Sequence, residues 1–185
     1  MSVTSPNDWL QYGMGGHNIE ANTILYHTLN QLSSLAAALN ESSLAASWTQ
    51  TASTLKSSAN TLLWDDSAGM YRDNETTTLH PQDGNAWAVV AHLTLSAIQS
   101  RSISSDLAMR WTAYGTPTAE AADAISPFIS GFELQAHVFA GKWGFMLDDP
   151  RMMNSTFIQG YSATGALLYA PYSLDARISR ALVPH

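Results

Sequence analysis

The chain has 185 residues, of which 45% are hydrophobic and 12% are charged, and its net charge is −7. This length suffices for a sizeable core, so we expect a single domain over residues 1–185. The negative charge argues against nucleic acid or an anionic membrane as a partner, because either would need a basic patch. No apolar run is long enough to span a bilayer, and the lack of cysteine excludes disulfides and thiolate metal sites.

The first part of the chain predicts an antiparallel helical hairpin. Asn18 can cap the first helix, and Glu20 would lie in its first turn. The apolar positions of this helix are Leu25, Leu29, Leu32, Ala36 and Leu39. Those of the second helix, after a break at Asn40, are Leu44, Trp48, Ala52, Leu55, Ala59 and Leu62. Because the link between the two patterns is short, the helices should pack antiparallel.

Turns and two shorter helices are predicted next. Trp64 to Gly69 has the composition of a turn, and Met70 to Arg72 suits a short extended piece. A polar loop then leads to a third helix, expected from Ala86 to about Ile98 with Asp83 as its cap. A fourth helix is indicated by apolar residues on one face, namely Ile103, Leu107, Trp111 and Tyr114.

A fifth helix is predicted from Ser126, which can cap it, to Gly141, which can end it. Its apolar face, which we expect to be buried, contains Phe128, Phe132, Ala136 and Phe139. Glu133 and His137 lie one turn apart on an adjacent face. Beyond this helix come the aromatic residues Trp143 and Phe145, a polar turn at Asp148-Asp149-Pro150, and the segment from Ser155 to Gly160. Such a mixture suits a sugar, which presents hydroxyl edges and flat C–H faces.

Four segments resemble the catalytic domain of fungal α-L-rhamnosidases, which are six-hairpin (α/α)6 glycoside hydrolases. These segments read GGHNIEAN (15–22), LHPQDGNA (79–86), SPFISGFELQAH (126–137) and STFIQGY (155–161). The resemblance implies an all-α fold of antiparallel α-hairpins that form part of the toroid. It also implies inverting hydrolysis of a terminal rhamnoside, so the expected partner is a carbohydrate. We expect no cofactor, and the spacing of the histidines indicates no metal site.

The same resemblance assigns the candidate site residues. Gln159 stands where the family has its general-base glutamate, and it is not competent as a base because an amide oxygen is barely basic. Glu133 is a second catalytic candidate, although on this helix it can instead pair with His137. The residues expected to bind substrate are Asn18, Glu20, Gln82, Asp83, Trp143 and Tyr161.

The departures from the family pattern predict weak or no hydrolysis. Relatives carry upstream sequence that includes their general acid, so no residue here inherits that role, and the chain resembles about half of a barrel. Unpaired hairpin flanks would expose apolar surface, so we expect self-association. The resemblance implies secretion, although no signal peptide precedes Ser2 in this sequence.

Two alternatives to a glycosidase remain open. One is a carbohydrate-binding domain without turnover that uses Trp143, Tyr161, Gln159 and Asp83. The other is a structural remnant of such an enzyme that binds no ligand. A serine hydrolase is not supported, because the sequence contains no G-x-S-x-G motif.

Overall fold

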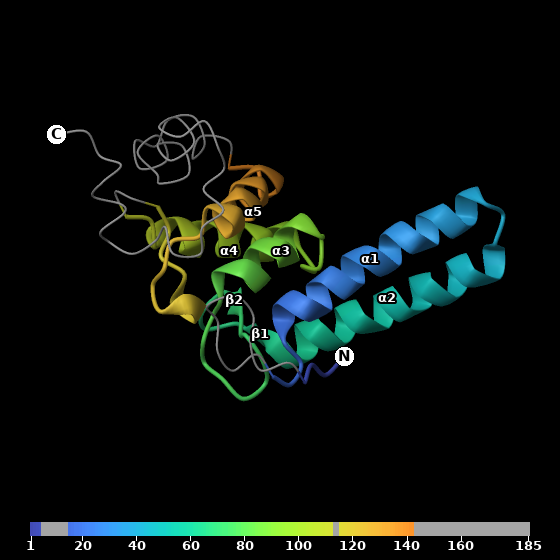
Figure 1. The fold of residues 1–185 in the computed structure, drawn as a ribbon, viewed down its shortest axis with the longest axis horizontal. Helices are drawn as coiled ribbons and strands as arrows, with labels where there is room; N and C mark the ends of the chain where they lie inside the picture. Colours follow the sequence, from blue (N-terminus) through green and yellow to red (C-terminus); the bar gives the residue numbers. More distant parts are fainter. Residues whose placement is uncertain (5–14, 113–114, 143–185) are drawn as a thin grey trace.

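The computed structural model describes residues 1–4, 15–112 and 115–142, which are mainly helical (Figure 1). The elements are α1 (Ile19–Ala38), α2 (Ser42–Leu63), β1 (Trp64–Asp65), β2 (Met70–Tyr71), α3 (Gln82–Val90), α4 (Ala97–Met109), the 3-10 helix η1 (Ala119–Ala121) and α5 (Pro127–Phe139). The two short strands pair antiparallel. The all-α prediction is therefore confirmed. Within the described ranges, no helix has the length and apolar character needed to cross a membrane.

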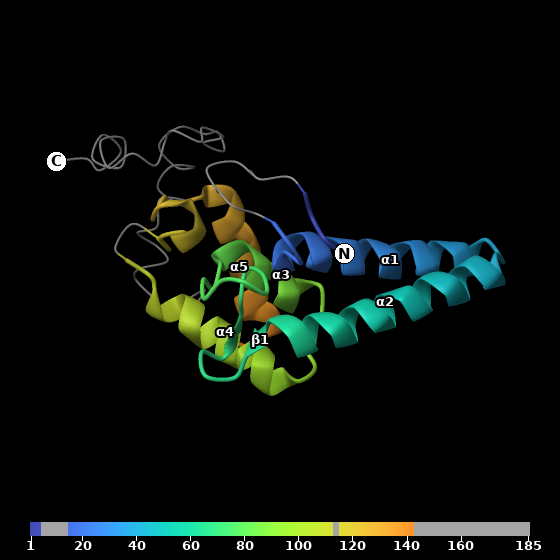
Figure 2. The same cartoon turned by 90° about the horizontal axis from the view of Figure 1, so that it is seen from below.

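Helices α1 and α2 form the predicted antiparallel hairpin, which extends away from the remaining helices in both views (Figures 1 and 2). Asn18 caps α1 as expected, because its Oδ1 atom accepts a hydrogen bond from the N–H of Ala21 at 2.9 Å. The chain reverses at Asn40, which has a φ of 63°. Asparagine tolerates this left-handed conformation better than most residues, so the link can be short.

The hairpin buries only part of its predicted apolar faces. The buried positions are Leu29, Ala36, Ala52 and Ala59, and the half-buried ones are Leu25, Leu32, Trp48 and Leu55. The prediction was wrong for Leu39 and Leu44, which are 63% and 44% exposed at the free end of the hairpin. It was also wrong for Leu62, which is 42% exposed, because the adjacent Leu63 is the residue that faces the core.

Helix α3 begins earlier and ends sooner than predicted, at Gln82 and Val90. The carboxylate of Glu120 accepts hydrogen bonds from the N–H groups of Gln82 and Asp83 at 2.8 and 3.1 Å, and so caps the helix from a distant loop. Asp83 therefore lies inside the first turn and is not the cap. The helix stops because His92 adopts a φ of 58°, and α4 then begins separately.

The core is formed by α3, α4, α5 and the base of the α1/α2 hairpin. Its largest fully buried apolar side chains are Tyr71, Ile19, Leu63, Leu93, Ile103 and Leu107. Helix α3 packs against both α1 and α5, so it is the central element of the described structure. Asn85 fastens α3 to β2, because its side chain bonds both the N–H and the carbonyl of Tyr71, at 2.8 and 2.9 Å.

Helix α5 has the predicted ends, but its buried side matches the predicted apolar face only in part: Ala136 is buried and Phe132 is partly buried against the core. Ser126 caps it as expected, through a hydrogen bond from the N–H of the third residue of the helix at 3.2 Å. Phe128 and Phe139 are 51% and 53% exposed, whereas Glu133 and His137 are 1% and 0% exposed. The burial prediction was wrong for Phe128 and Phe139, because polar groups of α3, α4 and the loop before α5 pack against the side of the helix that carries Glu133.

Candidate functional site

The first turns of α1 and α3 lie next to each other and bring four predicted site residues together, namely Asn18, Glu20, Gln82 and Asp83. Gly84 permits this approach, because a Cβ atom there would lie 2.3 Å from Cγ2 of Ile19 and 3.1 Å from the backbone nitrogen of Glu20. The structure thus joins two segments that are about sixty residues apart in the sequence.

The two amides of this group are engaged inside the protein. Asn18 is fully buried, and its Nδ2 atom donates to Oδ1 of Asp73 at 2.8 Å. Gln82 is also fully buried: its Nε2 atom donates to Glu133, and its Oε1 atom accepts from the Thr118 hydroxyl at 2.8 Å. Both amides therefore hold the helix starts in place.

The two carboxyl groups are placed differently from the amides. Glu20 is partly exposed, whereas Asp83 is 4% exposed. Burial raises the pKa of Asp83 well above its ordinary value, and the nearby carboxylates of Glu120, Glu20 and Asp73 raise it further. The start of α3 therefore favours a neutral Asp83, while Glu20 lies at the edge of the cluster.

Glu120 is a further candidate for the site, which sequence analysis missed. It is 7% exposed, and its Oε1 atom caps α3, but its Oε2 atom is buried without a hydrogen-bond partner among the described residues. Burial raises the pKa of Glu120, against the opposing effect of backbone N–H groups and of Arg110. The available signal was a lone acidic residue in the loop TPTAEAA (116–122), which is otherwise uncharged.

Glu133 lies at the centre of a buried network that connects α3, α4 and α5. Its carboxylate accepts hydrogen bonds from Gln82, from Nε1 of Trp111 and, at 3.2 Å, from the hydroxyl of Thr116. Its Oε1 atom also lies 3.3 Å from Nε2 of His137. The pairing with His137, weighed above as the alternative to catalysis, is therefore present.

A serine, a histidine and a glutamate form a continuous chain in this network. The Ser104 hydroxyl lies 2.7 Å from Nδ1 of His137, whose Nε2 atom faces Glu133. Ser104 and His137 are 0% exposed and Glu133 is 1% exposed. No substrate can reach the Ser104 hydroxyl in this arrangement. The three hydrogen-bonded residues therefore join α4 to α5 and do not provide a nucleophile.

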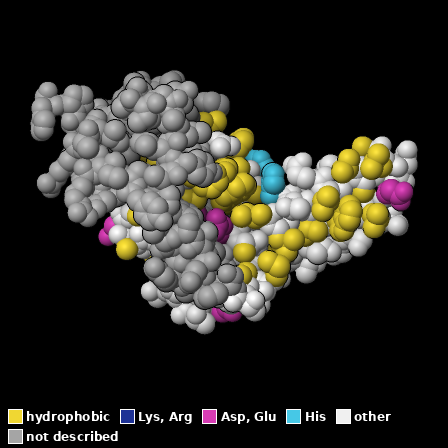
Figure 3. All heavy atoms as spheres, viewed as in Figure 1, with side chains coloured by type: hydrophobic (Ala, Val, Ile, Leu, Met, Phe, Trp, Pro, Cys, Tyr) yellow, Lys and Arg dark blue, Asp and Glu magenta, His cyan; other side chains and the backbone are white. Residues whose placement is uncertain are grey.

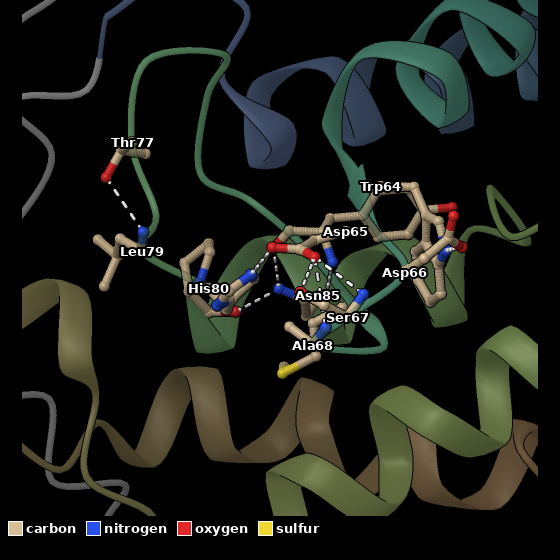
Figure 4. Close-up of polar contacts among 12 residues, drawn as sticks. Trp64, Asp65, Asp66, Ser67, Ala68, Thr77, Leu79, His80 and Asn85 are labelled. Carbon is tan, nitrogen blue, oxygen red and sulfur yellow. Dashed lines mark hydrogen bonds and ion pairs between the residues drawn. The ribbon is translucent and has the colours of Figure 1, made fainter.

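The acidic turn between β1 and β2 is occupied by internal contacts (Figure 4). Asp65 accepts hydrogen bonds from the hydroxyl and the N–H of Ser67 at 2.6 and 3.0 Å, and lies 3.2 Å from Nε2 of His80. These contacts, led by the Ser67 hydroxyl, lower the pKa of Asp65 to about 2. Within the described part of the chain, no group of histidine and acidic residues is arranged to hold a metal ion.

Three predicted site residues, Trp143, Gln159 and Tyr161, lie outside the described residues. In the described part, the α1/α2 hairpin packs against α3, α3 also packs against α5, and carboxyl groups gather where α1 and α3 begin.

Comparison with known families identifies the class of protein. The family described as Trehalase matches residues 17–125, which is more than half of the chain and includes the starts of both α1 and α3. The chain belongs to the trehalase family of six-hairpin glycosidases. It is thus a glycoside hydrolase-like domain whose helices form part of an (α/α)6 toroid. No curated protein matches the sequence.

Proposed function

We propose that residues 1–185 form one domain that binds a terminal α-L-rhamnoside at the starts of α1 and α3 and hydrolyses it weakly. The observation that supports this proposal is the juxtaposition of Glu20 and Asp83 at two adjacent helix starts in a chain of glycosidase family. Carboxyl oxygens accept hydrogen bonds from sugar hydroxyls. The four-segment resemblance to α-L-rhamnosidases supports the choice of sugar.

The described contacts divide the predicted residues into two roles. Glu20, which is partly exposed, and Asp83, at the start of α3, would contact the sugar. Asn18 and Gln82 would orient them from within the protein, because their amide groups already bond to internal partners. Glu133 would act through Gln82 as a positioning residue, since it is buried and accepts three hydrogen bonds.

Weak turnover follows from the residue at the general-base position. Inverting hydrolysis needs one carboxylic acid and one carboxylate, roughly 6.5–9.5 Å apart, to protonate the leaving oxygen and to activate water. Gln159 can bond a water or a hydroxyl, but its amide cannot take the proton. Trp143 and Tyr161 would supply flat faces for the C–H side of the sugar.

Calorimetric titration with methyl α-L-rhamnoside and with trehalose tests the ligand, because the matched family is described as Trehalase. We expect rhamnoside binding that Glu20→Gln weakens, while Glu41→Gln, an exposed acid at the far end of the hairpin, leaves it unchanged. Binding of trehalose alone would contradict the rhamnoside proposal. Binding without any product release would support the carbohydrate-binding alternative, and binding of neither sugar would contradict both.

We also propose that copies of the chain associate with one another through the free end of the α1/α2 hairpin. Leu35, Leu39 and Leu44 are 55%, 63% and 44% exposed there. Hydrophobic side chains are visible along this hairpin in Figure 3. Exposed apolar side chains of this kind support association between copies of the chain.

A further inference from the structure

Two buried carboxyl groups, those of Glu120 and Asp83, lie at the start of α3. The Oε2 atom of Glu120 is a buried acceptor without a donor among the described residues. Buried polar atoms of folded proteins nearly always have a partner, because leaving one unpaired is unfavourable. The Oε1 atom of the same carboxylate bonds the N–H groups of Gln82 and Asp83, so Glu120 is held over the first turn of α3.

The second carboxyl group is that of Asp83, which is 4% exposed in that same turn. Its Oδ1 atom accepts the N–H of Gly84 at 2.5 Å. The nearby charges that raise the pKa of Asp83 are Glu120 from η1, Glu20 from α1 and Asp73 from the loop before α3, while Arg110 acts on Glu120 in the opposite sense. The neutral form of Asp83 is therefore favoured, and a neutral carboxyl group carries an O–H that needs an acceptor.

We propose that Asp83 and Glu120 share one proton, which Asp83 carries on Oδ2 and donates to Oε2 of Glu120. This hydrogen bond would satisfy the buried acceptor and the buried donor at once. It makes Glu120 a positioning residue that fixes both the first turn of α3 and the Asp83 side chain. The consequence for ligand binding rests on the proposed function, but the proton-sharing pair itself does not.

A carbon-13 NMR titration of the aspartate carboxyl groups tests the pair directly, with Asp83 assigned by its absence in Asp83→Asn. In the wild type we expect Asp83 to stay protonated well above the ordinary aspartate range. Glu120→Gln should lower its titration midpoint by about one pH unit or more, because the amide Nε2 would donate to an ionised carboxylate. The matched acid-to-amide control, Glu41→Gln, should not shift the midpoint.

An ordinary midpoint for Asp83 in the wild type, or no shift in Glu120→Gln, would overturn the proposal.

The pH dependence of unfolding provides a second test if Glu120→Gln does not fold. Because the folded pKa of Asp83 is raised, its stabilising contribution is complete below the unfolded pKa and is lost as the pH rises through the folded pKa. Asp83→Asn, whose amide can donate permanently to Glu120, should lack this loss. Equal pH dependence of Asp83→Asn and wild type would also contradict the pair.

A double-variant cycle separates proton sharing from simple burial. Each single variant keeps one donor facing one acceptor, whereas Asp83→Asn with Glu120→Gln places two amide donors against each other. We therefore expect the double variant to lose more stability than the sum of the single variants, and additivity would count against the pair. If the titration agrees but methyl α-L-rhamnoside binds Asp83→Asn and wild type equally, the proposed sugar contact of Asp83 is wrong and the pair remains.

Discussion

Gly84 lies so close to Ile19 that a Cβ atom on Gly84 would stand 2.3 Å from Cγ2 of Ile19. Ile19 is the first residue of α1, and Gly84 belongs to the first turn of α3. Because Ile19 is fully buried, its side chain has little room to move away. The contact therefore sets how closely the starts of α1 and α3 can approach each other. It also sets how close Glu20, on α1, lies to Asp83, on α3.

Gly84→Ala should destabilise the domain by about 1–3 kcal/mol, because the added methyl group overpacks a filled contact. The measurement is the free energy of unfolding in urea. Gly131→Ala is a matched control in the interior of α5, where a Cβ meets nothing within 4 Å. This control should be neutral or stabilising by up to about 1 kcal/mol. A Gly84→Ala variant as stable as the wild type would show that α1 and α3 are not in tight contact.

Glu133→Ala should lower the free energy of unfolding by at least about 2 kcal/mol, because it removes the carboxylate that accepts hydrogen bonds from buried donors of Gln82, Trp111 and Thr116. Gln135→Ala, at an exposed position of the same helix, should change it by less than about 0.5 kcal/mol. Thermal and urea denaturation of both variants check this difference. If Glu133→Ala were as mild as Gln135→Ala, the network would not hold α3 against α5.

Stability should fall at acidic pH because of Glu75, which bonds the N–H of His17 at 2.8 Å. That N–H is the largest cause that lowers the pKa of Glu75, from 4.5 to about 2. A lowered folded pKa means that the stabilising contribution is present above pH 4.5 and is lost as the pH falls toward 2. Urea unfolding between these pH values should show this loss in the wild type.

Glu75→Gln is the variant that isolates this effect, because an amide does not titrate. Its unfolding free energy should depend less on pH in the acidic window than that of the wild type. The remaining dependence should include Asp65, whose pKa is also lowered to about 2. Identical acid profiles for wild type and Glu75→Gln would refute the assignment to Glu75.

Replacing Leu39 and Leu44 with serine should reduce self-association, since both leucines are exposed at the free end of the hairpin. Light scattering over a wide concentration range gives the measurement, and Thr51→Ser, at an exposed polar position of α2, is the control. A monomeric wild type at every concentration would contradict the proposed association.

The sequence predicted those parts of the fold that depend on local patterns. The cap at Asn18, the α1/α2 hairpin and the cap at Ser126 follow from residues close together in the chain, and all three are confirmed. The start of α3 could not be predicted in this way, because its cap is Glu120, more than thirty residues further on. Long-range partners of this kind leave no periodic signal in a single sequence.

The buried face of α5 also depends on long-range partners that a single sequence does not reveal. Phe128 and Phe139 fit the expected apolar stripe by spacing, but Glu133 and His137 occupy the interior because donors and acceptors from α3, α4 and the loop before α5 meet them there. The sequence indicated the segments 15–22 and 79–86, and the structure places the helix starts within them next to each other. It could not show that Asn18 and Gln82 use their amides internally, because that depends on Asp73, Thr118 and Glu133.

The most direct test of the glycosidase account compares wild type and Gln159→Glu on two rhamnosides, one unactivated and one aryl rhamnoside with a very good leaving group. Restoring a base should give marginal turnover on the unactivated substrate. It should give a larger gain on the aryl substrate, which needs little acid assistance, within the 10²–10⁴-fold that general-base catalysis typically contributes. Efficient hydrolysis of the unactivated rhamnoside by the wild type would show that Gln159 is not a missing base and would contradict the proposed site.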